Sequence, residues 1–130
     1  MKTSNMIVPN LLLGMAGGIQ YRALVRATKN PRKASEKTLR EILTYAKDTV
    51  YGKEHKFSYI LEAQDDTELY RRYREQVKPN EYEDFRPYVE RHKHGEADIL
   101  FPGKPVLYAT TSGSTAEPKW IPITERYLKT

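Results

Sequence analysis

Cysteine is absent from these 130 residues. This excludes disulfides and thiolate metal sites, and a reducing cytoplasm is the simplest compartment to expect. Long apolar runs are missing too. The patchy stretch from Met6 to Ile19 is interrupted by Pro9 and Asn10, whereas a membrane span needs about 20 apolar residues. We therefore expect no signal peptide and no membrane segment, and predict a helix over residues 10–28 instead.

Blocks of like charge are also missing. The net charge is +5, from 22 basic and 17 acidic residues. Such an excess could attract a nucleotide or another polyanion, but interspersed acids favour a solvated basic surface. Tyr and Arg alternate over residues 69–77, yet their helical spacing separates an apolar stripe from a charged face. Nucleic acid is therefore not an expected partner.

What is present favours one globular domain that begins with helices. Asn30 followed by Pro31 is a helix start signal. From there an apolar stripe predicts a helix that Gly52 ends. The stripe consists of Leu39, Ile42, Leu43, Ala46 and Val50. Residues 51–60 are predicted to be a loop, anchored in the core by Phe57, Tyr59 and Ile60.

Two more helices are predicted. Asp66 caps the first and Pro79 stops it; its inward side chains are Leu69, Tyr70, Tyr73 and Val77. The second begins around Glu83, has Pro87 in its first turn and ends at Gly95. Its inward side chains are Phe85, Tyr88 and Val89. His92 and His94 are two residues apart, so a helix points them in different directions, which does not favour a metal site.

A strand–loop–strand segment follows over residues 105–123. Val106 to Ala109 predict a buried strand. Trp120, Ile121 and Ile123 predict a second strand with Pro122 at an edge position, and Thr124 is the N-cap of a further helix. We therefore predict the α/β class, with residues 1–98 helical. Two short strands do not form an independent sheet, so the sheet is expected to continue beyond this chain.

The loop between the strands contains Thr111, Ser112, Gly113, Ser114 and Thr115, and Lys119 follows Pro118. Hydroxyls and backbone N–H groups donate hydrogen bonds to phosphate oxygens, glycine allows close approach, and lysine adds a positive charge. Such clusters are also common in solvent-exposed hairpin turns. The pattern is not a Walker loop, because it has one glycine and no Ser/Thr after the lysine. Composition leaves both interpretations open.

The order of these residues resembles the signature loop of the adenylate-forming superfamily, which includes acyl-CoA synthetases, peptide-synthetase adenylation domains and luciferases. Ala116 departs from it, because the superfamily prefers glycine there. Upstream, residues 49–53 (TVYGK) and 82–91 (YEDFRPYVER), together with 121–124 (IPIT), are similar to the auxin-responsive Gretchen Hagen acyl-acid amido synthetases, a branch of that superfamily.

The resemblance implies N-terminal helices that lead into the first strands of a luciferase-like large domain. The rest of that domain and a smaller C-terminal domain would be absent from residues 1–130. It also implies an ATP-dependent acid–amino acid ligase that activates a carboxylate as acyl-AMP and transfers it to an amine, with ATP and Mg²⁺. The residues implied to hold phosphate are Thr111, Ser112, Gly113, Ser114, Thr115 and Lys119; no catalytic or metal-ligating residue is assigned.

Two other functions stay open. One is an acyl-CoA ligase fragment, in which a thiol is the second nucleophile. The other is a non-catalytic helical interaction module whose Ser/Thr loop is only a turn. In either ligase reading the complete enzyme would bind a small carboxylic acid, and this chain alone would be inactive. Unpaired sheet edges further predict poor solubility or self-association.

Overall fold

The computed structural model describes residues 21, 25, 28–111 and 117–129. The chain forms two compact units, residues 1–38 and 39–130. In the first unit Tyr21, Val25, Thr28 and Lys29 are helical, and the Thr28 hydroxyl donates to the Val25 carbonyl at 2.8 Å. The other residues of the helix predicted over 10–28 lie outside the described part.

Helix α2 (Pro31–Ala46) begins where the sequence predicts. The Asn30 side-chain oxygen accepts from the Lys33 N–H at 3.1 Å, which confirms the N-cap. Its end was predicted wrongly, because the helix stops at Ala46 and Gly52 lies inside the next helix. Leu43 and Ala46 are buried as predicted, whereas Ile42 is 56% exposed.

The predicted loop over residues 51–60 is instead two short helices, α3 (Val50–Glu54) and α4 (Phe57–Leu61). Helices this short depend on tertiary contacts, which periodicity does not reveal. Thr49 caps α3 by accepting the Gly52 N–H at 3.0 Å, and its own hydroxyl donates to the Ala46 carbonyl. Phe57 is buried as predicted, and so is Ile60.

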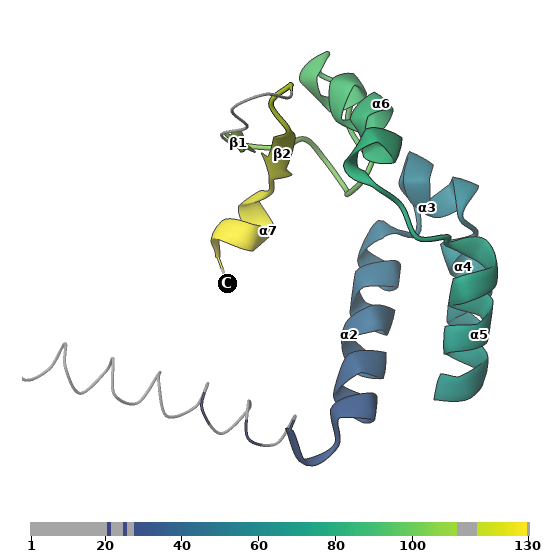
Figure 1. The fold of residues 1–130 in the computed structure, drawn as a ribbon. Helices are drawn as coiled ribbons and strands as arrows, with labels where there is room; N and C mark the ends of the chain where they lie inside the picture. Colours follow the sequence, from purple (N-terminus) through teal and green to yellow (C-terminus); the bar gives the residue numbers. More distant parts are fainter. Residues whose placement is uncertain (1–20, 22–24, 26–27, 112–116, 130) are drawn as a thin grey trace, which may run out of the picture. The chain divides into compact units, whose positions relative to one another are not determined.

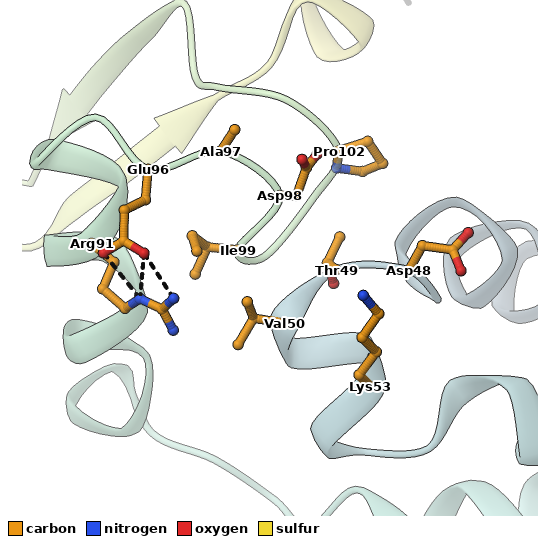
Figure 2. Close-up of a pocket in the computed structure, with 10 residues that line it drawn as sticks. All are labelled: Asp48, Thr49, Val50, Lys53, Arg91, Glu96, Ala97, Asp98, Ile99 and Pro102. Atoms are coloured by element: carbon orange, nitrogen blue, oxygen red, sulfur yellow. Dashed lines mark hydrogen bonds and ion pairs between the residues drawn. The ribbon is translucent and has the colours of Figure 1, made fainter.

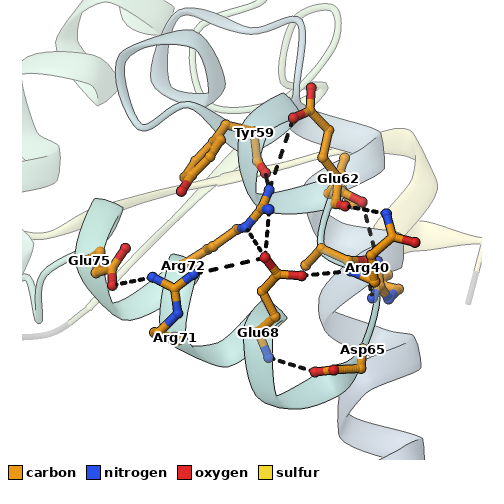
Figure 3. Close-up of polar contacts among 11 residues, drawn as sticks. Arg40, Tyr59, Glu62, Asp65, Glu68, Arg71, Arg72 and Glu75 are labelled. Carbon is orange, nitrogen blue, oxygen red and sulfur yellow. Dashed lines mark hydrogen bonds and ion pairs between the residues drawn. The ribbon is translucent and has the colours of Figure 1, made fainter.

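Tyr59 is 38% exposed, so its predicted role as a core anchor was wrong. It instead meets Arg72 of α5 (Asp66–Gln76). The Arg72 guanidinium lies 4.4 Å from the Tyr59 ring centroid and donates to the Tyr59 carbonyl at 2.6 Å. It also donates to Glu68 at 2.6 Å, and Arg71 pairs with Glu75 on the same helix (Figure 3). This network fixes α4 to α5.

Helix α5 is capped by Asp65, one residue before the predicted Asp66. The Asp65 carboxylate accepts the Glu68 N–H at 2.8 Å. The helix ends at Gln76, ahead of the predicted stop at Pro79. It contributes to a core drawn from α2, α3, α4 and α5. The buried members of this core are Leu43, Ala46, Tyr51, Phe57, Ile60, Ala63 and Leu69.

Helix α6 (Tyr82–Lys93) begins with a capping box between Glu81 and Asp84. Pro87 therefore falls in its second turn, not in the first turn as predicted. Its inward face includes Val89, which is 2% exposed. Gly95 ends the helix as predicted, with φ +88°, and its N–H donates to the His92 carbonyl at 2.9 Å. This is the glycine-terminated helix end that a left-handed residue permits.

Strands β1 (Leu107–Thr110) and β2 (Trp120–Ile123) form an antiparallel pair beside α6 (Figure 1). The prediction of a buried strand was wrong, because Leu107 is 47% exposed. Helix α7 (Glu125–Leu128) follows, and Thr124 caps it by accepting the Tyr127 N–H at 3.1 Å. The described chain is thus mainly helical with one small sheet, compatible with the predicted α/β class.

Candidate functional site

The two ends of the predicted phosphate loop meet at the tip of the hairpin. The Thr111 N–H donates to the Lys119 carbonyl at 3.2 Å, which adds one pair to the β1–β2 ladder. Both side chains are exposed. Ser112, Gly113, Ser114 and Thr115 lie outside the described residues. The structure therefore fixes the two flanks of the loop.

Lys119 carries a positive charge that no carboxylate cancels within the described part of the chain. Its ammonium lies 5.5 Å from the centroid of the Tyr82 ring, a cation–π contact. The pKa of Glu83 is lowered by its hydrogen bond to Arg86, and the charge of Lys119 adds to the same effect. Lys119 thus lies close enough to α6 to influence its acids, yet is not paired with them.

Tyr82 joins the hairpin to the start of α6. Its hydroxyl accepts the Trp120 N–H at 2.7 Å and donates to the Trp120 carbonyl at 3.1 Å. The Trp120 indole is held by two further contacts: the Lys93 ammonium lies 4.8 Å from a ring centroid, and Tyr108 packs edge-on at 6.1 Å. Backbone and side chain of Trp120 are therefore both fixed against α6.

Arg86 is the second cation near the loop, but its charge is already shared. It makes two hydrogen bonds to Glu83, at 2.7 and 2.9 Å, and an ion pair to Glu117 at 3.3 Å. The Glu83 hydrogen bond is the main cause of the raised pKa of Arg86. Its guanidinium lies 5.1 Å from the Tyr82 ring centroid. Lys119 is therefore better placed than Arg86 to attract an added anion.

A surface pocket of about 400 Å³ lies on another part of the second unit, between the start of α3 and the segment after α6 (Figure 2). Part of its polar lining is committed to the fold. Arg91 forms hydrogen bonds to Glu96, the shortest at 2.8 Å. The Val50 N–H at the start of α3 donates to the Asp98 carbonyl at 2.9 Å. These bonds make the pocket a junction between the start of α3 and the segment after α6.

The described residues contain neither a metal-binding cluster nor a membrane-spanning helix. No cluster of three or more His, Asp or Glu there could hold a metal ion. In the same residues, no helix has both the length and the apolar character needed to cross a bilayer.

The sequence did not single out Tyr82, Arg86 or Lys93 as partners of the loop. Tyr82 and Trp120 are 38 positions apart, so no local periodicity connects them. The one available signal was that Tyr82 opens a segment, residues 82–91, on which the family resemblance depends.

The second unit is thus a helical segment that ends in a hairpin, with Lys119 beside the connecting loop and no carboxylate paired with it among the described residues. The family model described as the GH3 family N-terminal domain matches residues 20–130. The chain belongs to this family. The predicted resemblance to the auxin-responsive Gretchen Hagen amido synthetases is thereby confirmed.

A curated relative is the probable indole-3-acetic acid-amido synthetase GH3.13 of Oryza sativa subsp. japonica. It is 37% identical over 71 residues, which cover 53% of this chain and 15% of the rice protein. The match therefore spans a small part of that relative. The comparison with solved structures found no match.

Proposed function

We propose that this segment supplies the ATP phosphate-binding loop of an ATP-dependent acid–amino acid ligase, at the start of a luciferase-like large domain. The observation that carries the proposal is the hydrogen-bonded pair of Thr111 and Lys119, which closes a Ser/Thr/Gly loop next to an uncancelled ammonium. Membership of the GH3 family supports it. We place the complete enzyme in the cytoplasm in this proposal.

In this proposal a carboxylate attacks the α-phosphate of ATP, pyrophosphate leaves, and an amino-acid amine then displaces AMP to form an amide. Ser112, Gly113, Ser114 and Thr115 donate backbone N–H hydrogen bonds to the phosphates, and the hydroxyls among them donate further ones. Thr111 contributes its hydroxyl, because its N–H is bound to the Lys119 carbonyl. Lys119 stabilises the charge that builds on the leaving pyrophosphate. Mg²⁺ would enter with ATP, because the described residues offer no acidic cluster of their own.

The test is carboxylate-dependent ATP–pyrophosphate exchange in a complete enzyme that carries this segment. Ser112→Ala and Lys119→Ala are each expected to lower kcat/KM for ATP by about 10- to 100-fold. The matched control is Lys129→Ala, which removes an exposed lysine paired with Glu125 on α7 and should leave exchange unchanged. Unaltered exchange in both loop variants would refute the phosphate-binding role.

The same enzyme separates the two ligase chemistries. AMP release that depends on an amino acid supports the amide-forming ligase, whereas release that depends on a thiol such as coenzyme A supports the acyl-CoA ligase. No exchange with any acid of a broad panel would leave the loop as a structural turn.

A further inference from the structure

We infer that Tyr82 is a positioning residue for the proposed nucleotide site: its hydroxyl fixes the free edge of β2, and its ring holds the ammonium of Lys119. The inference rests on the proposed function, because it concerns how the same loop is prepared for a polyphosphate. Three features of the described residues support it.

The first feature is the register of the hairpin. Thr111 and Lys119 are hydrogen-bonded to each other, and antiparallel ladders alternate between hydrogen-bonded and non-hydrogen-bonded pairs. The preceding pair, Thr110 and Trp120, is therefore non-hydrogen-bonded. Both backbone polar groups of Trp120 then face away from β1. They are the two groups that the Tyr82 hydroxyl binds, at 2.7 and 3.1 Å.

A tyrosine hydroxyl is suited to this position because it accepts and donates at once. Phenylalanine keeps the ring but can do neither. The next outward-facing residue of β2 is Pro122, opposite Tyr108, and proline has no N–H to satisfy. The outer edge of β2 therefore has no unsatisfied N–H: the Trp120 N–H is bound by Tyr82, and Pro122 has none. Tyr82 thus holds this edge, where the described residues provide no further strand.

The second feature is the position of the Tyr82 ring under Lys119, with the ammonium 5.5 Å from the ring centroid. A cation–π contact restrains an ammonium without neutralising it. The charge is therefore still available to an anion. This differs from Arg86, whose guanidinium is engaged by both Glu83 and Glu117.

The third feature is that one side chain acts on two consecutive residues. Tyr82 binds the backbone of Trp120 and the side chain of Lys119. It therefore restrains both the backbone at the end of the loop and the position of the Lys119 ammonium. Groups that are already ordered lose less freedom when a ligand binds. Loss of the hydroxyl should therefore weaken ATP binding although the hydroxyl itself need not touch ATP.

The experiment measures KM for ATP and kcat of pyrophosphate exchange in a complete enzyme that carries this segment. Tyr82→Phe is expected to raise KM about tenfold, the effect of two lost hydrogen bonds, with a smaller change in kcat. Tyr88→Phe is the matched control: it removes one hydroxyl from the same helix, but that hydroxyl binds Glu54. It should leave KM unchanged.

A second variant separates the backbone contact from the indole. Trp120→Phe keeps the N–H and C=O that Tyr82 binds, so it should retain the wild-type KM. A tenfold rise in this variant too would overturn the inference, because the effect would then arise from the indole. A wild-type KM in Tyr82→Phe would overturn the inference as well. Pyrophosphate exchange by the same variant would then still support the proposed function.

A measurement without nucleotide distinguishes the two levels of failure. Hydrogen exchange at the Trp120 amide of the 130-residue chain should be faster in Tyr82→Phe than in the wild type or in Tyr88→Phe. An unchanged rate of hydrogen exchange at the Trp120 amide of Tyr82→Phe would overturn the inference directly. Faster hydrogen exchange in Tyr82→Phe, combined with no pyrophosphate exchange by the wild-type enzyme, would refute the proposed function and with it the positioning role.

Discussion

His92 lies face to face with Phe101, with ring centroids 4.5 Å apart and an interplanar angle of 13°. Its Nε2 accepts the Leu100 N–H at 3.2 Å, and its Nδ1 lies 3.2 Å from the Glu96 carbonyl. Because a backbone N–H only donates, Nε2 must be unprotonated, and Nδ1 then donates to Glu96. The neutral ring therefore links the end of α6 to the segment after it.

This arrangement predicts that stability falls in mild acid. Burial lowers the pKa of His92 from 6.5, although the hydrogen bond to the Glu96 carbonyl opposes the shift. The unfolded chain takes up the proton first, so stability present above pH 6.5 is lost as pH falls through the lower folded pKa. The slope is at most about 1.4 kcal/mol per pH unit.

Urea unfolding at pH 7.5, 6.5 and 5.5 measures this effect. His92→Gln should flatten the pH dependence, whereas His94→Gln, at the exposed C-cap of the same helix, should retain it. Glu68, Glu83, Glu90 and Glu96 have a pKa below 4.5 in the folded chain. The stability that these carboxylates contribute is lost only as pH falls below 4.5, outside the range of pH 5.5 to 7.5. Equal slopes in the two histidine variants would contradict the assignment.

Gly52 is expected to tolerate no side chain. A Cβ there would overlap the carbonyl oxygen of Ala46 and lie 2.9 Å from its carbonyl carbon. That carbonyl also accepts the Thr49 N–H and hydroxyl, so it cannot move without breaking the cap of α3. We expect Gly52→Ala to lower the free energy of unfolding by about 3 kcal/mol.

The comparison variant is Gly95→Ala, because Gly95 has φ +88° but its Cβ would meet nothing closer than 4.0 Å. Only left-handed strain remains there, about 1 kcal/mol. Urea unfolding of both variants measures the difference. A smaller cost at Gly52 than at Gly95 would show that the α2–α3 turn can relax.

Arg72 is expected to matter more than its neighbour Arg71. The Arg72 side chain is 14% exposed and contacts the carbonyl and the ring of Tyr59. Arg71 is 52% exposed and bonds within its own helix. Loss of the Tyr59 contacts in Arg72→Ala should cost about 1–2 kcal/mol, whereas Arg71→Ala should be close to the wild type. Thermal unfolding measures both, and equal shifts would contradict the prediction.

Local signals predicted the parts of the fold that local chemistry determines. Asn30 with Pro31, Thr124 and Gly95 mark helix ends correctly because caps and left-handed residues act within one turn. The α3–α4 segment was missed, because its start depends on carbonyls 48 positions away. The Val50 N–H, for instance, donates to Asp98.

The candidate site was likewise predicted only in part. The order of residues around Thr111 and Lys119 located the loop, and the structure joins its two flanks. The contacts that hold those flanks were not predicted. Tyr82 lies in a stretch where helical spacing predicts only which side chains face inward, and its two-way hydrogen bonds to Trp120 depend on how the hairpin meets α6.

The open face of the hairpin predicts how the isolated chain behaves. Tyr108 and Trp120 face α6, whereas Leu107 and Ile121, on the opposite face, are 47% and 45% exposed. Apolar side chains left in water on a two-stranded sheet favour association. We expect the 130-residue chain to self-associate as its concentration rises, and Ile121→Lys to reduce this.

Sedimentation velocity over a range of concentrations measures the association. Ile42→Lys is the matched control, because Ile42 is 56% exposed but lies on α2 and not on the hairpin. If the hairpin face drives association, only Ile121→Lys should shift the distribution toward monomer. An equal shift from both variants would instead indicate that added positive charge acts through general repulsion. A monomeric wild-type chain at every concentration would show that the open face is too small to bind a second copy.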